Sequence, residues 1–188
     1  DWAAGQVANG VLGADYSSRL NQEIRIKRGL SYGAGSGLDA RRAGGLFMAS
    51  TQTKNESAAE VLGIIRTEIA RMRDSLPGGD ELTARKAALI GDFSRSLETT
   101  AGLAGNVATL VVDDLALDDL GRFIGEIQAV TPQQVQAFAQ AHWQAERARA
   151  VLVGDAQRFA ADLGKTDASI LTITRDSLNL DRGDLVQH

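Results

Sequence analysis

The spacing of apolar residues changes twice along this chain, and that change most constrains its fold. Residues 2–28 carry apolar residues at helical spacing, residues 30–53 carry them with a period close to two, and residues 57–143 return to helical spacing. Helices and strands are therefore segregated along the chain instead of alternating, which favours an α+β layer architecture over a doubly wound parallel sheet. We expect an antiparallel sheet packed against a layer of helices.

Local signals predict the individual elements. Helices are expected at Trp2 to Leu12, Ser17 to Arg28, Ser57 to Leu76, Asp80 to Leu97, Gly102 to Val112, Asp118 to Ile127 and Pro132 to Ala139. Gly29 is a candidate C-cap, and capping boxes are expected at Ser57–Glu60 and Thr131–Gln134. Strands at 30–38 and 46–53, joined by a turn-like segment at 39–45, predict a β-hairpin.

The C-terminal part is predicted to return to a strand. Residues 148–153 form a mostly apolar run that ends in Gly-Asp, which is typical of a buried strand followed by a turn. A helix carrying Phe159 and Leu163 should follow, and residues 170–174 are a weak strand candidate. We expect one domain over residues 1–164 and a C-terminal tail over residues 165–188.

Composition excludes several classes of function. The 188 residues suit one domain of ordinary size, and a net charge of -4 gives no basic surplus for binding nucleic acid. The absence of cysteine excludes disulfides, thiolate metal sites and a cysteine nucleophile. No apolar run approaches the ~20 residues that a membrane-spanning helix needs. The compartment stays open between bacterial periplasm and cytoplasm; because the sequence begins at Asp1 without a methionine, we expect a mature form or an excised piece.

The sequence contains no complete catalytic centre of its own. Its two histidines are His142 and His188, and neither HExxH nor HxxEH occurs, so the three ligands that catalytic zinc usually needs are missing. We expect a structural or surface role for His142, which has Glu146 four residues later, and a mobile terminal position for His188. Residues 29–33 match the G-x-S-x-G pattern around Ser31, but the expected order of a helix before and a strand after is the reverse of a nucleophile elbow.

Two further patterns are interpreted as structural. Paired carboxylates at 113–114 and 118–119 are expected at solvated helix ends, where negative charge favours the N-terminal dipole. The glycine-rich segment 29–37 lacks the strand-to-helix placement of a nucleotide site, and no GK[ST] follows it. Glycines within a strand more often mark a close backbone approach, and a peptide lying along this strand would be such an approach.

One block of sequence carries a family resemblance. Residues 11–32 read VLGADYSSRLNQEIRIKRGLSY. They resemble the opening of the C-terminal domain of M16 (pitrilysin/insulinase-like) zinc metallopeptidases, which typically reads LGG-x-x-SSRL-x-x-x-(L/I)R-x-(K/E)-x-GL-x-Y. The predicted hairpin, the two helices after Ser57 and the helix and strand that follow Thr131 also fit this family, so the resemblance extends from about residue 7 to about residue 163.

The resemblance implies that the enzyme has two similar halves, within one chain or as paired subunits, and that each half supplies different residues to the active site. The first half carries HxxEH and a distal glutamate that hold zinc, and the second half lacks zinc and supplies an arginine and a tyrosine. These two positions fall on Arg25 and Tyr32. The resemblance therefore implies a non-zinc domain or R/Y-type subunit that is inactive alone and has no cofactor of its own. Its expected partners are an HxxEH-bearing M16 domain or subunit, with zinc in that partner half, and an extended peptide substrate.

The chemistry of the two side chains suits these roles. A tyrosine hydroxyl is a neutral donor that can meet the oxyanion of peptide hydrolysis, and an arginine fork can bind and orient a substrate carbonyl. The resemblance thus implies that Tyr32 assists catalysis and that Arg25 contacts the substrate.

Two departures from the family pattern and two other functions stay open at this point. The family domain normally begins with strand-forming sequence, so we expect this chain to lack its first strands, and Ala14 stands where a second glycine is common. Relatives of this fold serve as non-proteolytic core subunits of a respiratory complex, and a free peptide-binding module is a third interpretation. The presence of Arg25 and Tyr32 favours the peptidase half, since a pure scaffold would not need them.

Overall fold

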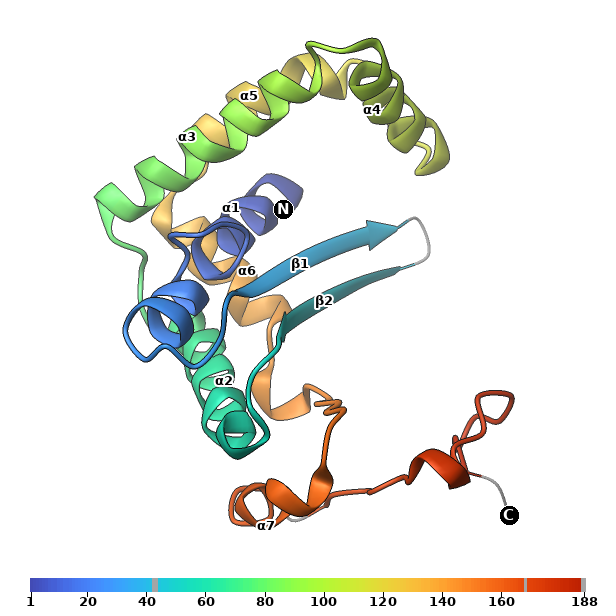
Figure 1. Cartoon of the computed structure of the whole chain (residues 1–188). Coiled ribbons are helices and arrows are strands. Elements are labelled where there is room, and N and C mark those ends of the chain that lie inside the picture. Colours follow the sequence, from blue (N-terminus) through green and yellow to red (C-terminus); the bar gives the residue numbers. More distant parts are fainter. Residues whose placement is uncertain (42–43, 168, 187–188) are drawn as a thin grey trace.

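The computed structural model describes residues 1–188 except 42–43, 168 and 187–188 (Figure 1). Its helices are α1 (Trp2–Leu12), α2 (Ala58–Asp74), α3 (Gly79–Ser96), α4 (Thr100–Val112), α5 (Asp119–Ala129), α6 (Pro132–His142) and the short α7 (Ala160–Leu163). A π-helix spans Asn21–Ile26, and strands β1 (Ala34–Arg41) and β2 (Gly44–Thr51) form an antiparallel hairpin. The hairpin packs against a layer of helices, which confirms the predicted α+β class.

Helix α1 lies at the centre of the core. Val7, Ala8, Val11 and Leu12 are fully buried, and the helix packs against α6, α3, α5 and β1. Small side chains permit these close contacts, because a Cβ on Gly5 would lie 2.7 Å from the ring of Phe138 on α6. The abundance of alanine and glycine in this helix therefore reflects packing on several sides.

The hairpin differs from its prediction at both ends. The pairing runs from Ala34 opposite Thr51 to Arg41 opposite Gly44, so most of the predicted turn segment 39–45 is strand, and residues 42–43 lie outside the described residues. Residues 30–33 are not strand, because side chains satisfy their backbone groups: the Thr53 hydroxyl donates to the carbonyl oxygen of Leu30 over 2.6 Å.

Most predicted helix boundaries agree with the structure within a few residues, but only one capping box is formed. At α6 the Thr131 hydroxyl accepts from the backbone N–H of Gln134, and the Gln134 side chain accepts from the backbone N–H of Thr131. At α2 the predicted box is wrong. Ser57 ends a 3-10 turn with helical backbone angles and makes no capping hydrogen bond, because a capping side chain requires an extended residue there.

The predicted buried strand at 148–153 is also wrong. The backbone there is irregular, and Val151 and Val153 are 86% and 97% exposed. A strand is stable only where a neighbouring strand satisfies its backbone, and this segment pairs with neither β1 nor β2. Residues 170–174 are likewise not strand. A short helix, α7, does follow 148–153; it carries Leu163, Phe159 directly precedes it, and both side chains are buried.

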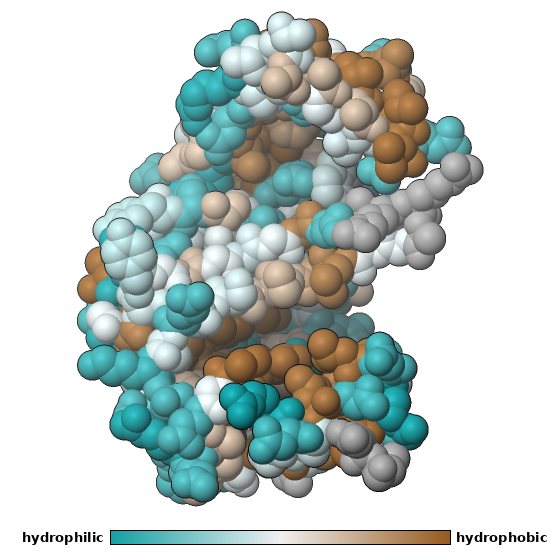
Figure 2. All heavy atoms as spheres, turned by 45° about the vertical axis from the view of Figure 1, so that its right-hand side comes forward, coloured by the Kyte–Doolittle hydropathy of each residue, from teal (hydrophilic) through white to brown (hydrophobic). Residues whose placement is uncertain are grey.

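Apolar side chains are also exposed elsewhere on the molecule. Helix α4 has no buried residue. Figure 2 shows one face of the molecule, and hydrophobic atoms gather over α4 in the upper part of this view. The exposed apolar residues of α4 and the turn after it are Leu103, Val111, Val112, Leu115 and Leu117. Within the described residues, no helix is both long and apolar enough to cross a membrane.

Gly13 provides a test of the packing between α1 and the hairpin. Its carbonyl accepts from the backbone N–H of Ser36 over 2.9 Å, and a Cβ there would lie 2.6 Å from the Ser36 nitrogen. We expect Gly13→Ala to destabilise the protein by about 2 kcal/mol, because backbone must shift to relieve the contact. Urea unfolding followed by circular dichroism measures this change.

Gly63→Ala is the matched control for this substitution. Gly63 is exposed on α2, and nothing lies within 4 Å of a Cβ built there. Alanine should stabilise this helix by roughly 0.5–1 kcal/mol. Equal effects of the two substitutions would contradict the close approach at Gly13.

Candidate functional site

The structure brings Arg25 and Tyr32 together. The guanidinium carbon of Arg25 lies 4.7 Å from the centre of the Tyr32 ring and 4.5 Å from the centre of the Tyr16 ring. Arg25 is half-buried, whereas Tyr32 and Tyr16 are 89% and 59% exposed. The three side chains form one exposed cluster, the Arg25 cluster, at the start of the hairpin. Sequence reasoning did not single out Tyr16, although it stands directly before the SSRL motif.

Arg25 lies on the π-helix, where the turn is wider than in an α-helix. The backbone N–H of Lys27 donates to the carbonyl of Gln22 over 3.0 Å, and Lys27, not the predicted Gly29, is the C-cap; Gly29 follows two residues later with a φ of +62°. Leu20 and Ile24 are fully buried on the inner side. Single π-turns inside helices are frequent at functional sites, and here the irregular turn carries the arginine. Gly29 has the left-handed backbone expected of a residue that ends a helix.

The buried Asn21 connects the three parts of the chain that carry the cluster. Its side-chain amide donates to the carbonyl of Asp15 over 2.9 Å and to the carbonyl of Ala34 over 2.7 Å. Its side-chain oxygen accepts from the backbone N–H of Ala34 over 2.9 Å. Asp15 adjoins Tyr16, and Ala34 is the second residue after Tyr32. One amide thus fixes the loop before the helix, the helix and the start of β1 relative to one another.

Two arginine–carboxylate pairs hold the same region against α3. The nearly buried Arg85 donates to both carboxylate oxygens of Asp15 and to the hydroxyl and carbonyl of Ser17, over 2.5–2.8 Å. Arg19 makes a bidentate pair with Glu81 at 2.8 and 2.9 Å. Bidentate pairs fix orientation as well as distance. Both residues that flank Tyr16 are therefore bound to one side chain of α3.

Protonation of these pairs follows from their surroundings. Burial alone would raise the pKa of Glu81, but the hydrogen bonds and charge of Arg19 lower it below its ordinary value of 4.5, and the Glu81 bond raises the pKa of Arg19. Hydrogen bonds from Lys27 and then Arg28 lower the pKa of Glu23. These carboxylates are ionised at neutral pH and neutralise the basic residues around the π-helix.

Arg25 differs from these neighbours. Within the described part of the chain, its guanidinium makes no hydrogen bond or ion pair and contacts aromatic rings instead. A guanidinium on an aromatic face keeps its charge and its N–H donors. The cluster is therefore a half-buried cation between two exposed rings, with no hydrogen-bond partner for its donors among the described residues.

The other sequence candidates have structural surroundings. The Ser31 hydroxyl accepts from the backbone N–H of Gly33 and lies 2.6 Å from the carbonyl oxygen of Gln52, so it joins the hairpin to the preceding loop. His142 lies at the surface end of α6, 3.3 Å from Asp1, and Glu146 pairs with Arg73 instead. His188 lies outside the described residues. No group of three or more histidine, cysteine, aspartate or glutamate side chains in the described ranges could hold a metal ion.

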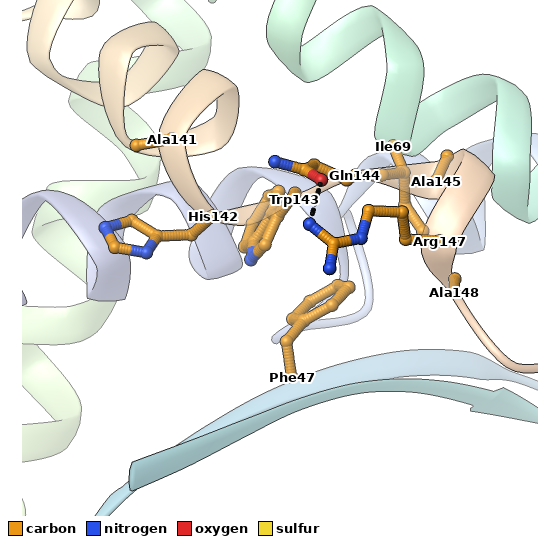
Figure 3. A pocket seen from close by; sticks show the side chains of 9 residues that line it. All are labelled: Phe47, Ile69, Ala141, His142, Trp143, Gln144, Ala145, Arg147 and Ala148. Atoms are coloured by element: carbon orange, nitrogen blue, oxygen red, sulfur yellow. Dashed lines mark hydrogen bonds between the residues drawn. The ribbon is translucent and has the colours of Figure 1, made fainter.

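A separate cavity of about 410 Å³ lies beside Trp143, between β2 and the end of α6 (Figure 3). Phe47 stacks on Trp143 at 4.4 Å, and Arg147 donates to Gln144 across the opening. The indole nitrogen of Trp143 is buried without a partner. This cavity shares no lining residue with the Arg25 cluster and contains no acid–base pair.

Known proteins that are similar to this chain in sequence and structure point to the M16 peptidases. The sequence profile described as the peptidase M16 inactive domain matches residues 1–89. An uncharacterised zinc protease from Streptomyces coelicolor is 32% identical over 141 residues, which is 73% of this chain and 30% of that protein. A crystal structure of a peptidase M16 inactive domain from Pseudomonas fluorescens is 31% identical, with a TM-score of 0.72, over 78% of this chain and 35% of that one. Residues 1–89 therefore match the inactive domain of M16 peptidases, and the similarity to an M16 inactive-domain structure extends over 78% of this chain.

The matched profile and the matched crystal structure are both described as an inactive domain of M16 peptidases. This chain spans about a third of the length of each of these two relatives. A chain of complex III from Candida albicans shares the fold alone, at 13% identity and a TM-score of 0.64. The sequence contains no HxxEH motif.

The importance of Asn21 can be tested by Asn21→Ala. The substitution leaves a buried N–H and a buried carbonyl of Ala34 without their partner, and we expect a loss of about 2–4 kcal/mol in the free energy of unfolding. Gln22→Ala, on the same helix turn, should change it by less than about 0.5 kcal/mol. If the two substitutions have equal effects in chemical unfolding, Asn21 is not the connecting residue.

The lowered pKa of Glu81 predicts a pH dependence of stability. Because the folded-state pKa lies below the ordinary 4.5, the pair with Arg19 stabilises fully above that pH and is lost as the pH falls through the folded value. Glu81→Gln should therefore be less stable than wild type at neutral pH, by roughly 1–2 kcal/mol after allowance for solvent screening, and the gap should close in acid.

Unfolding of both proteins in urea across a pH series measures that gap. Glu98→Gln, at an exposed site just after α3, is the control and should differ little from wild type at neutral pH. A gap for Glu81→Gln that stays constant down to low pH would refute the assignment.

Proposed function

We propose that this chain is the non-zinc half of an M16-type metallopeptidase. It supplies Arg25 and Tyr32 to a zinc site carried by another domain or subunit, for the hydrolysis of extended peptides. The observation that carries the proposal is the Arg25 cluster: an arginine without an ionic partner among the described residues, in contact with two exposed tyrosines. Unpaired charge and exposed aromatic surface at one place are features of binding sites.

Arg25 binds a carbonyl oxygen of the substrate backbone. Its planar fork can donate two parallel hydrogen bonds, so it fixes the direction of the carbonyl as well as its distance. The roles of the neighbouring basic residues differ, because Arg19, Arg28 and Arg85 already bind carboxylates of this chain. Arg25 is the one arginine of the region proposed to contact substrate.

Tyr32 donates its hydroxyl hydrogen bond to the oxygen of the scissile carbonyl as negative charge develops there. A phenol O–H is a neutral hydrogen-bond donor, so it can meet the developing oxyanion beside a neighbouring cation. Its high exposure leaves the hydroxyl open toward a partner surface. The donor acts mainly in the transition state, so its removal should lower kcat more than it raises KM.

Zinc has no place on the described part of this chain, since no suitable group of ligands lies there. In the proposed assembly the metal belongs to the HxxEH-bearing partner, where it would activate the attacking water. This chain alone is then inactive, and its catalytic contribution requires the partner. We also keep the division into a domain of residues 1–164 and a tail of residues 165–188 as part of the proposal.

A non-proteolytic core subunit is the alternative, and the shared fold with a chain of complex III favours it. A scaffold gains nothing from an unpaired arginine beside two exposed tyrosines, so the cluster supports the peptidase half. A free peptide-binding module is a third possibility, which would require measurable affinity of the chain alone for peptides.

The test is hydrolysis of a quenched peptide pool by this chain together with its zinc-bearing half. Tyr32→Phe should lower kcat by roughly 10²–10³, because it removes one oxyanion donor and leaves the ring in place. Arg25→Lys should mainly raise KM, because an ammonium group cannot reproduce the fork.

Arg28→Lys is the matched control, since Arg28 lies near Arg25 but pairs with Glu23. Zinc content and folding must match wild type in every variant. An unchanged rate in Tyr32→Phe would remove Tyr32 from catalysis, and no hydrolysis by the wild-type assembly would favour the scaffold.

A further inference from the structure

The Arg25 cluster contains a third side chain with no assigned role, Tyr16. We propose that Tyr16 is a positioning residue that holds the Arg25 guanidinium in the orientation in which it binds the substrate carbonyl. This inference rests on the proposed function, because it assigns a role to Tyr16 within the same site.

The contact itself is the first observation. The Arg25 guanidinium carbon lies 4.5 Å from the centre of the Tyr16 ring, slightly closer than its 4.7 Å distance from Tyr32. Both distances are within the range of an attractive cation–π contact. Arginine has a long flexible side chain, and since Arg25 has no carboxylate partner among the described residues, its contacts with these rings help to restrict it.

Hydrogen bonds hold the backbone on both sides of Tyr16, so this residue does not lie on a loosely held loop. Asp15 and Ser17 on either side of it are bound by the nearly buried Arg85 of α3. The Asp15 carbonyl also accepts from Asn21. The ring of Tyr16 therefore starts from a rigid position, and a rigid position is what a residue that orients another must have.

The backbone at Tyr32 is held differently. Tyr32 lies in the irregular segment before β1, and its ring is 89% exposed. In the proposed reaction its hydroxyl turns toward the scissile carbonyl, and the ring then need not stay on Arg25. Tyr16 takes no part in the chemistry and can keep Arg25 in place throughout. The two tyrosines thus have separate roles: Tyr32 donates a hydrogen bond to the oxyanion, and Tyr16 keeps the Arg25 guanidinium in its orientation.

The nature of the contact explains why an aromatic ring suits this role better than a carboxylate. A carboxylate would occupy the fork of Arg25 and cancel its charge, as Glu23 and Glu81 do for their partners. A ring contacts the face of the guanidinium and leaves N–H groups at its edge free. Tyr16 therefore restricts the arginine without competing with substrate.

The experiment compares Tyr16→Leu with Tyr16→Phe in the assembled, zinc-bearing enzyme. Loss of the ring should raise KM about fivefold and change kcat by less than about twofold, because orientation of Arg25 affects binding of ground and transition states alike. Tyr16→Phe keeps the ring and should restore the wild-type KM. An unchanged KM in Tyr16→Leu, or equal values in the two variants, would overturn the proposal.

A structural readout accompanies the kinetics. In NMR spectra the δ-methylene protons of Arg25 should be shifted upfield by the tyrosine rings, and Tyr16→Leu should move them toward random-coil values while Tyr16→Phe does not. Unmoved signals in Tyr16→Leu would contradict the contact. Tyr16 is largely exposed, so Tyr16→Leu should remain folded, which thermal unfolding verifies.

Tyr32→Phe in the same assay distinguishes a failure of the positioning role of Tyr16 from a failure of the proposed function. A large fall in kcat in Tyr32→Phe together with a silent Tyr16→Leu would refute the role of Tyr16 and leave the proposed function intact. A silent Tyr32→Phe would instead remove Tyr32 from catalysis, and the absence of hydrolysis by the wild-type assembly would remove the proposed function and this inference with it.

Discussion

The hydrogen bonds of the Asn21 side chain are the interaction on which the site depends. One buried amide donates to two carbonyls and accepts from one N–H, and so joins the loop of Tyr16, the helix of Arg25 and the strand entry after Tyr32. A buried amide left partly unpaired would be costly, so this geometry is strongly preferred in the folded state. Sequence-distant residues are thereby placed in one cluster.

Around that amide, the charged residues divide into two groups. Arg19 and Arg85 donate hydrogen bonds to carboxylates, and Arg85 also donates to a backbone carbonyl. These bonds hold the segment around Tyr16 against α3. Arg25 contacts rings and keeps its donors free. The same residue type thus serves for support and for proposed recognition, and the partner of each guanidinium distinguishes the two uses.

In the proposed assembly, this chain and a zinc-bearing partner would contribute different elements of one reaction. The described residues of this chain offer no metal-binding group, but they place the half-buried Arg25 beside the exposed Tyr32. Exposure is what such a half requires, because its functional atoms must reach across to another surface. Stabilisation of the oxyanion and orientation of the carbonyl need fixed geometry more than local pKa changes.

Much of the fold was predictable, since helices α1, α3, α4 and α6 follow from local spacing, glycine stops and a Thr131–Gln134 cap. The strand predicted at 148–153 failed, because apolar sequence favours a strand only where another strand pairs with it. The family resemblance pointed to Arg25 and Tyr32 but not to Tyr16 or Asn21. Those two act through contacts between segments, which sequence spacing does not report.

The sequence by itself determined the α+β class, the position of the hairpin, the absence of HxxEH and the pair of residues that the family resemblance implies, because these depend on local periodicity and on motifs. Only the tertiary structure decided that Arg25 has aromatic neighbours and no ionic partner in the described residues. It also decided that Arg85, some 70 residues away in sequence, supports the loop of Tyr16. The physical reason is that side-chain pairing is set by packing of distant segments, which a single sequence does not encode locally.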